Sequence, residues 1–147
     1  MPFVSVTRLH MASVFRLPQF LWSSLAVGRQ ARRAPGFVGG WLGNDAERGF
    51  WTVTVWDSAT AMRAFRNRGR HVKVMPKLLQ WADEAAYTHW EQPEATVPGG
   101  NAAYERLAGG GTLSKLLKPS PRHAAGERVG RAVPRQAQTQ IAETAPS

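Results

Sequence analysis

The chain has 147 residues, of which 43% are hydrophobic and 20% charged, a composition that suits one domain with an apolar core. Its net charge of +9 comes without zinc-ligand spacing, an RNP-like aromatic strand or another nucleic-acid motif, so we expect no nucleic-acid partner. The lack of cysteine excludes disulfides, thiolate nucleophiles and cysteine metal sites, and no apolar run is long enough to predict a transmembrane segment.

The first predicted element is a strand over residues 3–11, FVSVTRLHM, because this stretch is rich in β-forming residues. Arg8 and His10 interrupt its apolar character, so the N-terminus does not resemble a signal peptide. We therefore expect a cytoplasmic protein.

A helix is predicted next, within residues 16–33. Pro18 suits its first turn, where a missing N–H would have no partner in any case. Arginines crowd the other end, where positive charge interacts favourably with the helix dipole. Pro35 and Gly36 then end the helix.

Two strands follow, over residues 36–45 and 50–57, and the short polar loop between them predicts a hairpin. Gly39 and Gly40 lie inside the first of these strands. Glycine inside a strand indicates a bulge or the close approach of another group. Beside large aromatic residues, these two glycines would leave room for a flat ligand.

The second helical region is predicted to be split. Ser58 is a good N-cap, Gly69 breaks the helix, and a second piece covers about residues 70–83. Pro76 should kink or limit that piece, because proline lacks the N–H that a helix interior uses. A fourth strand is predicted over residues 84–92, EAAYTHWEQ.

The order strand-helix-strand-strand-helix-strand predicts an α+β, ferredoxin-like fold: a four-stranded antiparallel sheet in the order 4-1-3-2 with both helices on one face. The predicted strands carry tryptophan, valine, phenylalanine and leucine on both faces. A large exposed apolar face is a liability, so we expect a second copy to cover it and to form a closed barrel in a twofold homodimer.

The composition divides the chain into three parts. Residues 1–92 form the predicted dimeric α/β-barrel domain. Residues 93–118 form a C-terminal extension with a short helix between glycines. Residues 119–147 are rich in Pro, Ala, Arg, Gln and Thr without aromatic residues, which predicts a disordered basic tail.

The predicted order, with PGF and TVTVWDSATAMRAF, resembles the dimeric α/β-barrel superfamily, which includes antibiotic-biosynthesis and haem-degrading monooxygenases. LWSSLAVGRQARRAPGFVGGW is similar to part of the spheroidene monooxygenase-like proteins, which oxidise carotenoids, and residues 65–107 are similar to a related family of unknown function. The likeness covers about residues 3–118. It implies a monooxygenase-like oxidoreductase that acts on or binds a hydrophobic small molecule, with or without haem. The alternative is a non-catalytic ligand-binding or structural dimer.

The resemblance assigns few residues. Trp56 matches the tryptophan that closes the third strand across the superfamily. The histidine that ligates iron in the haem-degrading members falls near Met75 here, and His71 lies about one turn earlier. Their strand-one asparagine is absent, because this strand offers Thr7 and Arg8 instead.

The weak catalytic candidates are therefore His71 and Arg8, and the predicted ligand-binding residues are Trp56, Trp41, His10 and His71. His10 and His89 lie on strands that should pair, but no third ligand is evident, so no metal site is predicted. The basic run over residues 63–77 is either a solvated helix face or a guide for an anionic ligand such as a haem propionate.

Overall fold

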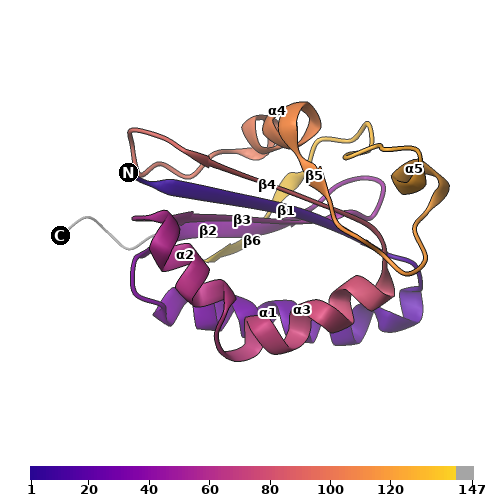
Figure 1. The fold of residues 1–147 in the computed structure, drawn as a ribbon, viewed down its shortest axis with the longest axis horizontal. Coiled ribbons are helices and arrows are strands. Elements are labelled where there is room, and N and C mark those ends of the chain that lie inside the picture. The colour runs from indigo at the N-terminus through magenta and orange to yellow at the C-terminus, as the bar shows by residue number, and fades with distance from the viewer. Residues whose placement is uncertain (142–147) are drawn as a thin grey trace.

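The computed structural model describes residues 1–141, which form one antiparallel sheet with helices on both faces (Figure 1). The strands are β1 (Phe3–Met11), β2 (Phe37–Asn44), β3 (Phe50–Trp56), β4 (Ala82–Glu91), β5 (Thr112–Leu113) and β6 (Arg135–Ile141). The helices are the 3-10 turn η1 (Val14–Arg16), α1 (Leu17–Arg33), α2 (Ala59–Arg66), α3 (Gly69–Trp81), α4 (Gly100–Gly110) and α5 (Pro121–Ala124). Across the sheet the strands lie in the order β5-β4-β1-β3-β2-β6.

The four central strands follow the predicted order. β1 pairs with β3 on one side and β4 on the other, and β2 pairs with β3 as a hairpin. The ferredoxin-like α+β fold is therefore confirmed. The sheet has six strands where four were expected, because β5 pairs with β4 and β6 pairs with β2. Each edge of the central sheet thus carries a strand from the C-terminal part of the chain.

Alternation along β1 and β3 sorts their side chains between the two faces of the sheet. Val4 and Val6 of β1, and Val53 and Val55 of β3, share one face and are fully buried. The intervening positions turn toward α1, α2 and α3, and they are polar in the middle of both strands. The face that meets these helices is therefore the less apolar of the two.

Local signals explain how the helices on this face begin. The Ser58 hydroxyl caps α2 by accepting a 3.2 Å hydrogen bond from the backbone N–H of Ala61, and Pro18 lies in the first turn of α1. Pro76 lies inside α3 without ending it, and the helix continues to Trp81. None of the helices in residues 1–141 is long and apolar enough to cross a membrane.

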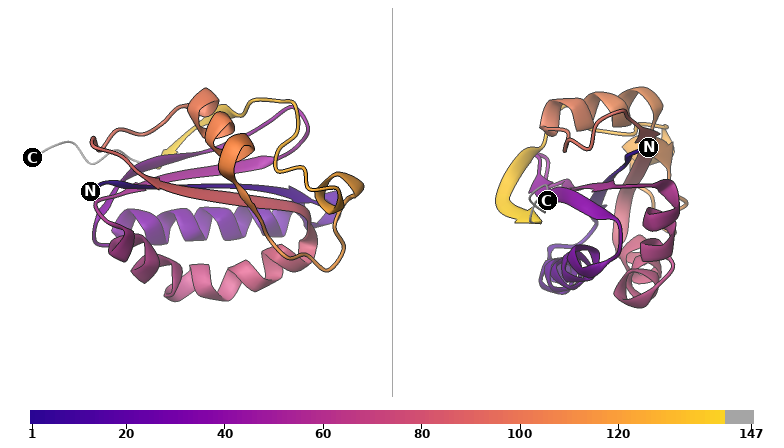
Figure 2. Two further views of the ribbon diagram at one scale, coloured as in Figure 1. Left: turned by 45° about the horizontal axis from the view of Figure 1, so that its top comes forward. Right: turned by 90° about the vertical axis from the view of Figure 1, so that its left-hand side faces the viewer.

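The opposite face of the sheet is covered by the chain itself. Residues 93–141, the C-terminal segment, cross this face and place α4 against it, on the side away from α1 and α3 (Figures 1 and 2). Ala103 and Leu107 of α4 are fully buried against Val53, Trp41 and their neighbours. The premise that helices cover one face only is therefore wrong, because α4 covers the second face, and the homodimer stays a prediction.

The prediction of a disordered tail from residue 119 is also wrong for the residues that the structure describes. The buried ring of His123 lies 3.0 Å from the backbone carbonyl of Ser114, and Arg122 forms ion pairs with Glu47 and Glu84. These contacts fix α5 although its composition is polar. Residues 142–147 of the predicted tail lie outside the described residues.

Candidate functional site

A cavity of about 310 Å3 lies between the sheet and the helices α1, α2 and α3. We call it the inner cavity. Its volume is at the lower end of the range for sites that bind drug-sized molecules. Strands β1, β3 and β4 form its floor, the three helices form its roof, and Ser114 closes part of its rim.

The floor of the inner cavity is polar. Two rungs cross it, each with one residue from β3, β1 and β4: Thr54–Ser5–His89 and Thr52–Thr7–Tyr87. The hydroxyl oxygen of Thr54 accepts a 3.0 Å hydrogen bond from the indole N–H of Trp56. Because a hydroxyl group both donates and accepts, Thr54 can still donate its own hydrogen to a ligand.

The roof is apolar. Its residues come from all three helices: Phe20, Val27, Ala31, Met62, Phe65, Met75, Leu78 and Leu79. Apolar walls with a few polar groups on one side are typical of sites that bind an apolar molecule in a defined orientation. The inner cavity therefore suits a largely apolar ligand with one or two polar groups.

His71 lies in the first turn of α3 and lines the cavity. Its Nδ1 lies 3.1 Å from the backbone carbonyl of Arg66, and a carbonyl can only accept, so Nδ1 carries the proton and Nε2 keeps a free lone pair. Burial lowers the pKa of His71 below its ordinary value, and the nearby charge of Arg66 lowers it further. Near neutral pH, His71 is therefore uncharged and has one oriented basic nitrogen.

His89 is a second neutral imidazole on the cavity floor. Burial lowers its pKa first, and the charges of Arg66 and Arg63 add to this effect. Its ring packs at centroid distances of 5.3 Å from Phe3 and 5.5 Å from Tyr87. It makes no hydrogen bond to the residues that the structure describes, so its ring nitrogens are available to a ligand.

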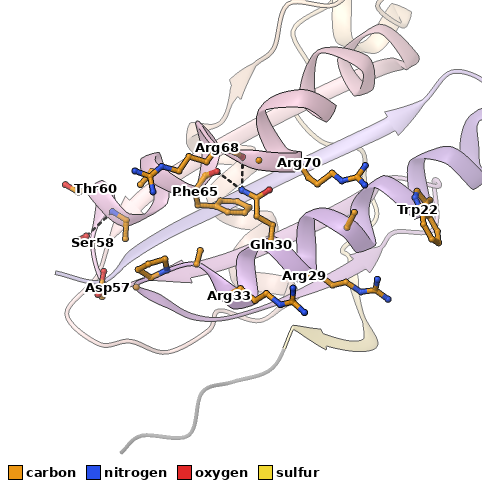
Figure 3. Close-up of a pocket in the computed structure, with 17 residues that line it drawn as sticks. Trp22, Arg29, Gln30, Arg33, Asp57, Ser58, Thr60, Phe65, Arg68 and Arg70 are labelled. Atoms are coloured by element: carbon orange, nitrogen blue, oxygen red, sulfur yellow. Dashed lines mark hydrogen bonds between the residues drawn. The ribbon is translucent and has the colours of Figure 1, made fainter.

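A second concavity, of about 880 Å3, lies on the outer side of α1 and the α2–α3 junction, and we call it the outer groove (Figure 3). Arg29 and Arg33 line it from α1, and Arg68 and Arg70 line it from the junction. None of these four exposed arginines forms an ion pair within residues 1–141. The groove is larger than the inner cavity, but its polar groups are solvated.

Gln30 of α1 stands between the two concavities. Its side-chain amide donates to the backbone carbonyls of Phe65, at 3.1 Å, and Arg68, at 2.7 Å, as the dashed lines in Figure 3 show. Its carbonyl oxygen accepts a 2.9 Å hydrogen bond from the backbone N–H of His71. Phe65 lines both concavities, and its ring meets His71 edge-on. Gln30 therefore holds the turn that positions His71.

Arg8 is buried on the opposite face of the sheet. Its guanidinium contacts the carboxylate of Asp45 at 2.9 Å and that of Glu84 at 3.2 Å. Burial alone would raise the pKa of Asp45, but hydrogen bonds from Trp51 and Arg8 hold it below its ordinary value. A side chain at Gly49 would overlap both Arg8 and Asp45, so glycine makes room for this pair. Arg8 is therefore a structural cation, away from the inner cavity.

One further cluster carries groups that bind metal ions. Ligand atoms of His10, Asp83 and Glu84 lie within 4.8 Å of one another. Glu84 already contacts the guanidinium groups of Arg8 and Arg122, which would repel a cation. The prediction that His10 could face His89 is wrong, because His10 lies opposite Glu84. We therefore assign this cluster to ion pairing.

Among the residues predicted for the site, His71 alone lines the inner cavity. Trp56 is fully buried behind it and stacks on a roof residue. Trp41 lies on the opposite face, where its indole N–H donates to the carbonyl of Pro98 at 2.8 Å. His10 is paired with Asp83 at 2.5 Å. Three of the five predicted ligand or catalytic residues, namely Arg8, His10 and Trp41, thus lie away from the face that α1, α2 and α3 cover.

The glycines in β2 do not open a ligand space either. A side chain at Gly40 would overlap the backbone carbonyl of Val53, so the room is filled by the neighbouring strand. The sequence interpretation missed the two polar rungs of the floor. Ser5, Thr7, Thr52 and Thr54 alternate with valines and Trp51, and this alternation was the available signal for a polar face beneath the helices.

No protein-family model matches the sequence, and no curated protein is significantly similar to it. The solved structures that share its fold include the following three. SnoaB from Streptomyces nogalater, described as a cofactor-independent oxygenase, is 15% identical with a TM-score of 0.54, over 63% of this chain and 94% of that chain. A putative antibiotic biosynthesis monooxygenase from Nitrosomonas europaea is 12% identical with a TM-score of 0.58. The match covers 65% of this chain and 93% of that chain.

The third structure, Rv0793 from Mycobacterium tuberculosis, is 15% identical with a TM-score of 0.59, over 65% of this chain and 100% of that chain. At such identities the likeness shows the fold alone, which is the ferredoxin-like fold that this chain shares with these three proteins. About a third of this chain lies outside the match. The likeness to spheroidene monooxygenase-like proteins stays a prediction.

Proposed function

We propose that this chain is a monooxygenase-like protein that binds a hydrophobic small molecule in the inner cavity and oxygenates it without a bound cofactor. The observation that carries the proposal is His71, a neutral histidine whose one free basic nitrogen lies in the lining of a cavity with a polar floor and a largely apolar roof. The fold that the chain shares with SnoaB, described as a cofactor-independent oxygenase, supports the same reaction class. Cytoplasmic localisation stays a prediction.

The reaction we propose needs a substrate with an acidic CH2 group. Nε2 of His71 takes one proton from this carbon, and the resulting carbanion gives electrons to O2. The carbon–oxygen bond that forms gives a peroxide anion, which takes the proton back from His71 and becomes a hydroperoxide. Loss of the second C–H proton and cleavage of the O–O bond then release water and leave a ketone. One CH2 group and one O2 thus become one C=O group and one water, and the proton held by His71 leaves with the water.

Other residues of the cavity would assist this step. The positive charge of Arg66 lies close enough to His71 and His89 to lower the pKa of both, so it would also stabilise a carbanion or enolate that forms beside them. The hydroxyl of Thr54 can donate to a substrate oxygen. The apolar roof would exclude water from the carbanion, which water would otherwise protonate.

Haem does not fit the inner cavity. The volume of the inner cavity, about 310 Å3, lies at the lower end of the range for ligand sites. A porphyrin with two propionates is larger than the ligands that such small sites hold. Filling it with haem would require α1 and α3 to move apart. We therefore derive no step through haem, although His71 is a neutral imidazole that could ligate iron.

The test uses dithranol, a tricyclic anthrone with an acidic CH2 group. Oxygen uptake and quinone absorbance are recorded with the purified chain and with buffer alone. We expect uptake above the buffer rate, and a loss of about 10²-fold or more in His71→Gln, the scale of a lost general base. His10→Gln is the matched control, because His10 lies outside the cavity lining. Uptake at the buffer rate, or a His71→Gln variant as active as the unchanged chain, would contradict the proposal.

A second candidate function is binding without catalysis. The observation that favours it is the hydrogen bond of Nδ1 of His71 to a backbone carbonyl. A carboxylate in that position would raise the basicity of Nε2 and make His71 a stronger base. Quenching of tryptophan fluorescence by dithranol under nitrogen measures binding alone. Binding that saturates, together with oxygen uptake at the buffer rate, would favour this second function.

A further inference from the structure

The C-terminal segment covers the most apolar surface of the sheet. Val4, Val6, Val53 and Val55 are fully buried there, although they are side chains of a sheet face with no other helix above it. α4 supplies the cover, chiefly through residues that are themselves fully buried, such as Leu107. Figure 2 shows α4 on this side of the sheet and α1 and α3 on the other.

Polar contacts hold the segment along its whole length. At its start, the carbonyl of Pro98 accepts from the indole of Trp41 at 2.8 Å. In its middle, the backbone N–H of Ser114 donates to the carbonyl of Ala85 at 3.0 Å, and β5 pairs with β4. Near its end, the hydroxyl of Tyr104 donates to the carbonyl of Gly130 at 2.8 Å and closes the segment on itself.

A further contact of the segment is an ion-pair bridge. Arg122 of α5 contacts Glu47, in the β2–β3 turn, and Glu84, on β4, both at 2.8 Å. Hydrogen bonds from Arg122 lower the pKa of Glu47, and they lower that of Glu84 despite the opposing effect of burial. One residue of the segment thus joins the β2–β3 turn to β4, which are far apart in the sequence.

The covered surface has the composition that two packed sheets present to each other. It is a patch of valines with two tryptophans, bordered by the buried Arg8, and apolar sheet faces pack about 10 Å apart in two-sheet cores. Under twofold symmetry, the same patch on a second copy would be its own complement. The segment competes for this patch from within the same chain.

We infer that the C-terminal segment replaces a second copy at this face, so that the chain is a monomer while the segment is docked and pairs face to face when the segment is released. Because the segment is tethered to the sheet, it should bind this face in preference to a second copy. A segment on a short linker has an effective concentration in the millimolar range, so at micromolar protein it outcompetes a second copy about a thousandfold at equal intrinsic affinity. The homodimer expected from the sequence would then need the segment to leave.

The experiment compares the full chain with two leucine variants by light scattering. Leu107→Asp places a charge at a fully buried position of α4, and Leu117→Asp makes the same change at a position that is 75% exposed. We expect the unchanged chain and Leu117→Asp to have the monomer mass of 16.2 kDa throughout the micromolar range, and Leu107→Asp to have twice that mass. A dimeric unchanged chain, or a folded but monomeric Leu107→Asp, overturns the inference.

A second release variant covers the case in which Leu107→Asp loses its fold. Ala103→Pro removes the 3.0 Å hydrogen bond from the N–H of Ala103 to the carbonyl of Gly99, and its ring disrupts the first turn of α4 at a fully buried position without placing a charge on the sheet. We expect this variant to double in mass as the protein concentration rises, while circular dichroism still reports the central sheet. A monomer mass for Ala103→Pro at every concentration overturns the inference when Leu107→Asp cannot be used.

Discussion

Replacing Arg8 with methionine tests the role that the structure gives to this residue. Its guanidinium is 2% exposed and contacts Asp45 at 2.9 Å and Glu84 at 3.2 Å. Methionine keeps an unbranched apolar stem and removes the charge, so Arg8→Met leaves the carboxylate of Asp45 buried without its cation. We therefore expect a large loss of stability and no direct effect on the inner cavity, which lies on the other face of the sheet.

The magnitude follows from what each carboxylate retains. Removing one partner of a buried ion pair costs about 3–5 kcal/mol. Asp45 keeps hydrogen bonds from the indole of Trp51 and the backbone of Gly49, and Glu84 keeps its contact with Arg122. We therefore expect the lower part of that range, about 3 kcal/mol. The free energy of unfolding of a small domain is about 5–15 kcal/mol, so the variant should remain folded at low temperature.

The assay is urea unfolding with linear extrapolation to water. Arg122→Met is the matched control, because Arg122 is 39% exposed and solvent screens its ion pairs, so each is worth about 1 kcal/mol or less. In Arg8→Met/Asp45→Asn the orphaned charge is gone, and the loss should be smaller than in Arg8→Met alone. The reasoning is refuted by a loss below about 1 kcal/mol in Arg8→Met, or by a double variant that is no more stable than the single one.

Three further outcomes are expected. Gln30→Ala removes three hydrogen bonds that hold the α2–α3 junction and should lower the free energy of unfolding by about 1–3 kcal/mol, which calorimetry would detect. Gly36→Ala should lower the melting temperature, because the φ of Gly36 is 84° and a side chain there would strike Asp57. Gly109→Ala should raise the melting temperature, because a side chain at this helical position meets open space. Equal effects of the two substitutions would contradict this reasoning. Because the folded pKa of His71 lies below 6.5, the unfolded chain binds a proton first, so stability should fall as the pH drops below about 6.5; an unchanged slope in His71→Gln would contradict this.

The central fold could be predicted from local signals. β-forming residues, a capping serine and helix-ending glycines marked the elements, and the order of elements then specified the topology. β5, β6 and α5 could not be predicted in this way. β5 has two residues, and α5 is held mainly by Arg122, whose partners Glu47 and Glu84 are 75 and 38 positions away. Such long-range ion pairs leave no trace in local composition.

The site could be predicted only in part, because period-two alternation groups side chains without showing which group meets the helices. Arg8 and His10 share a face of β1 with Val4 and Val6, and α4 covers that face. Placing all candidate residues in one site therefore mixed the two faces. His71 was selected because it begins a helix near the position expected from the resemblance, and its hydrogen bond to a backbone carbonyl could be seen only in the structure.

The position of β6 in the chain has a consequence for protein synthesis. β6 covers the outer edge of β2, yet it is made about 90 positions later than that strand. At a typical rate of 5–20 residues per second, the edge of β2 stays open for roughly 5–20 s on the ribosome. During this time the glycine-rich, aromatic β2 offers an unpaired edge to any other extended chain.

The apolar face of the sheet also stays uncovered for a time, although a shorter one, because α4 follows the last central strand. The nascent chain therefore exposes the edge of β2 and the apolar face of the sheet before it contains the residues that bury them. Slow synthesis or premature termination prolongs that state and should favour aggregation, whereas the completed chain buries both surfaces within a single molecule.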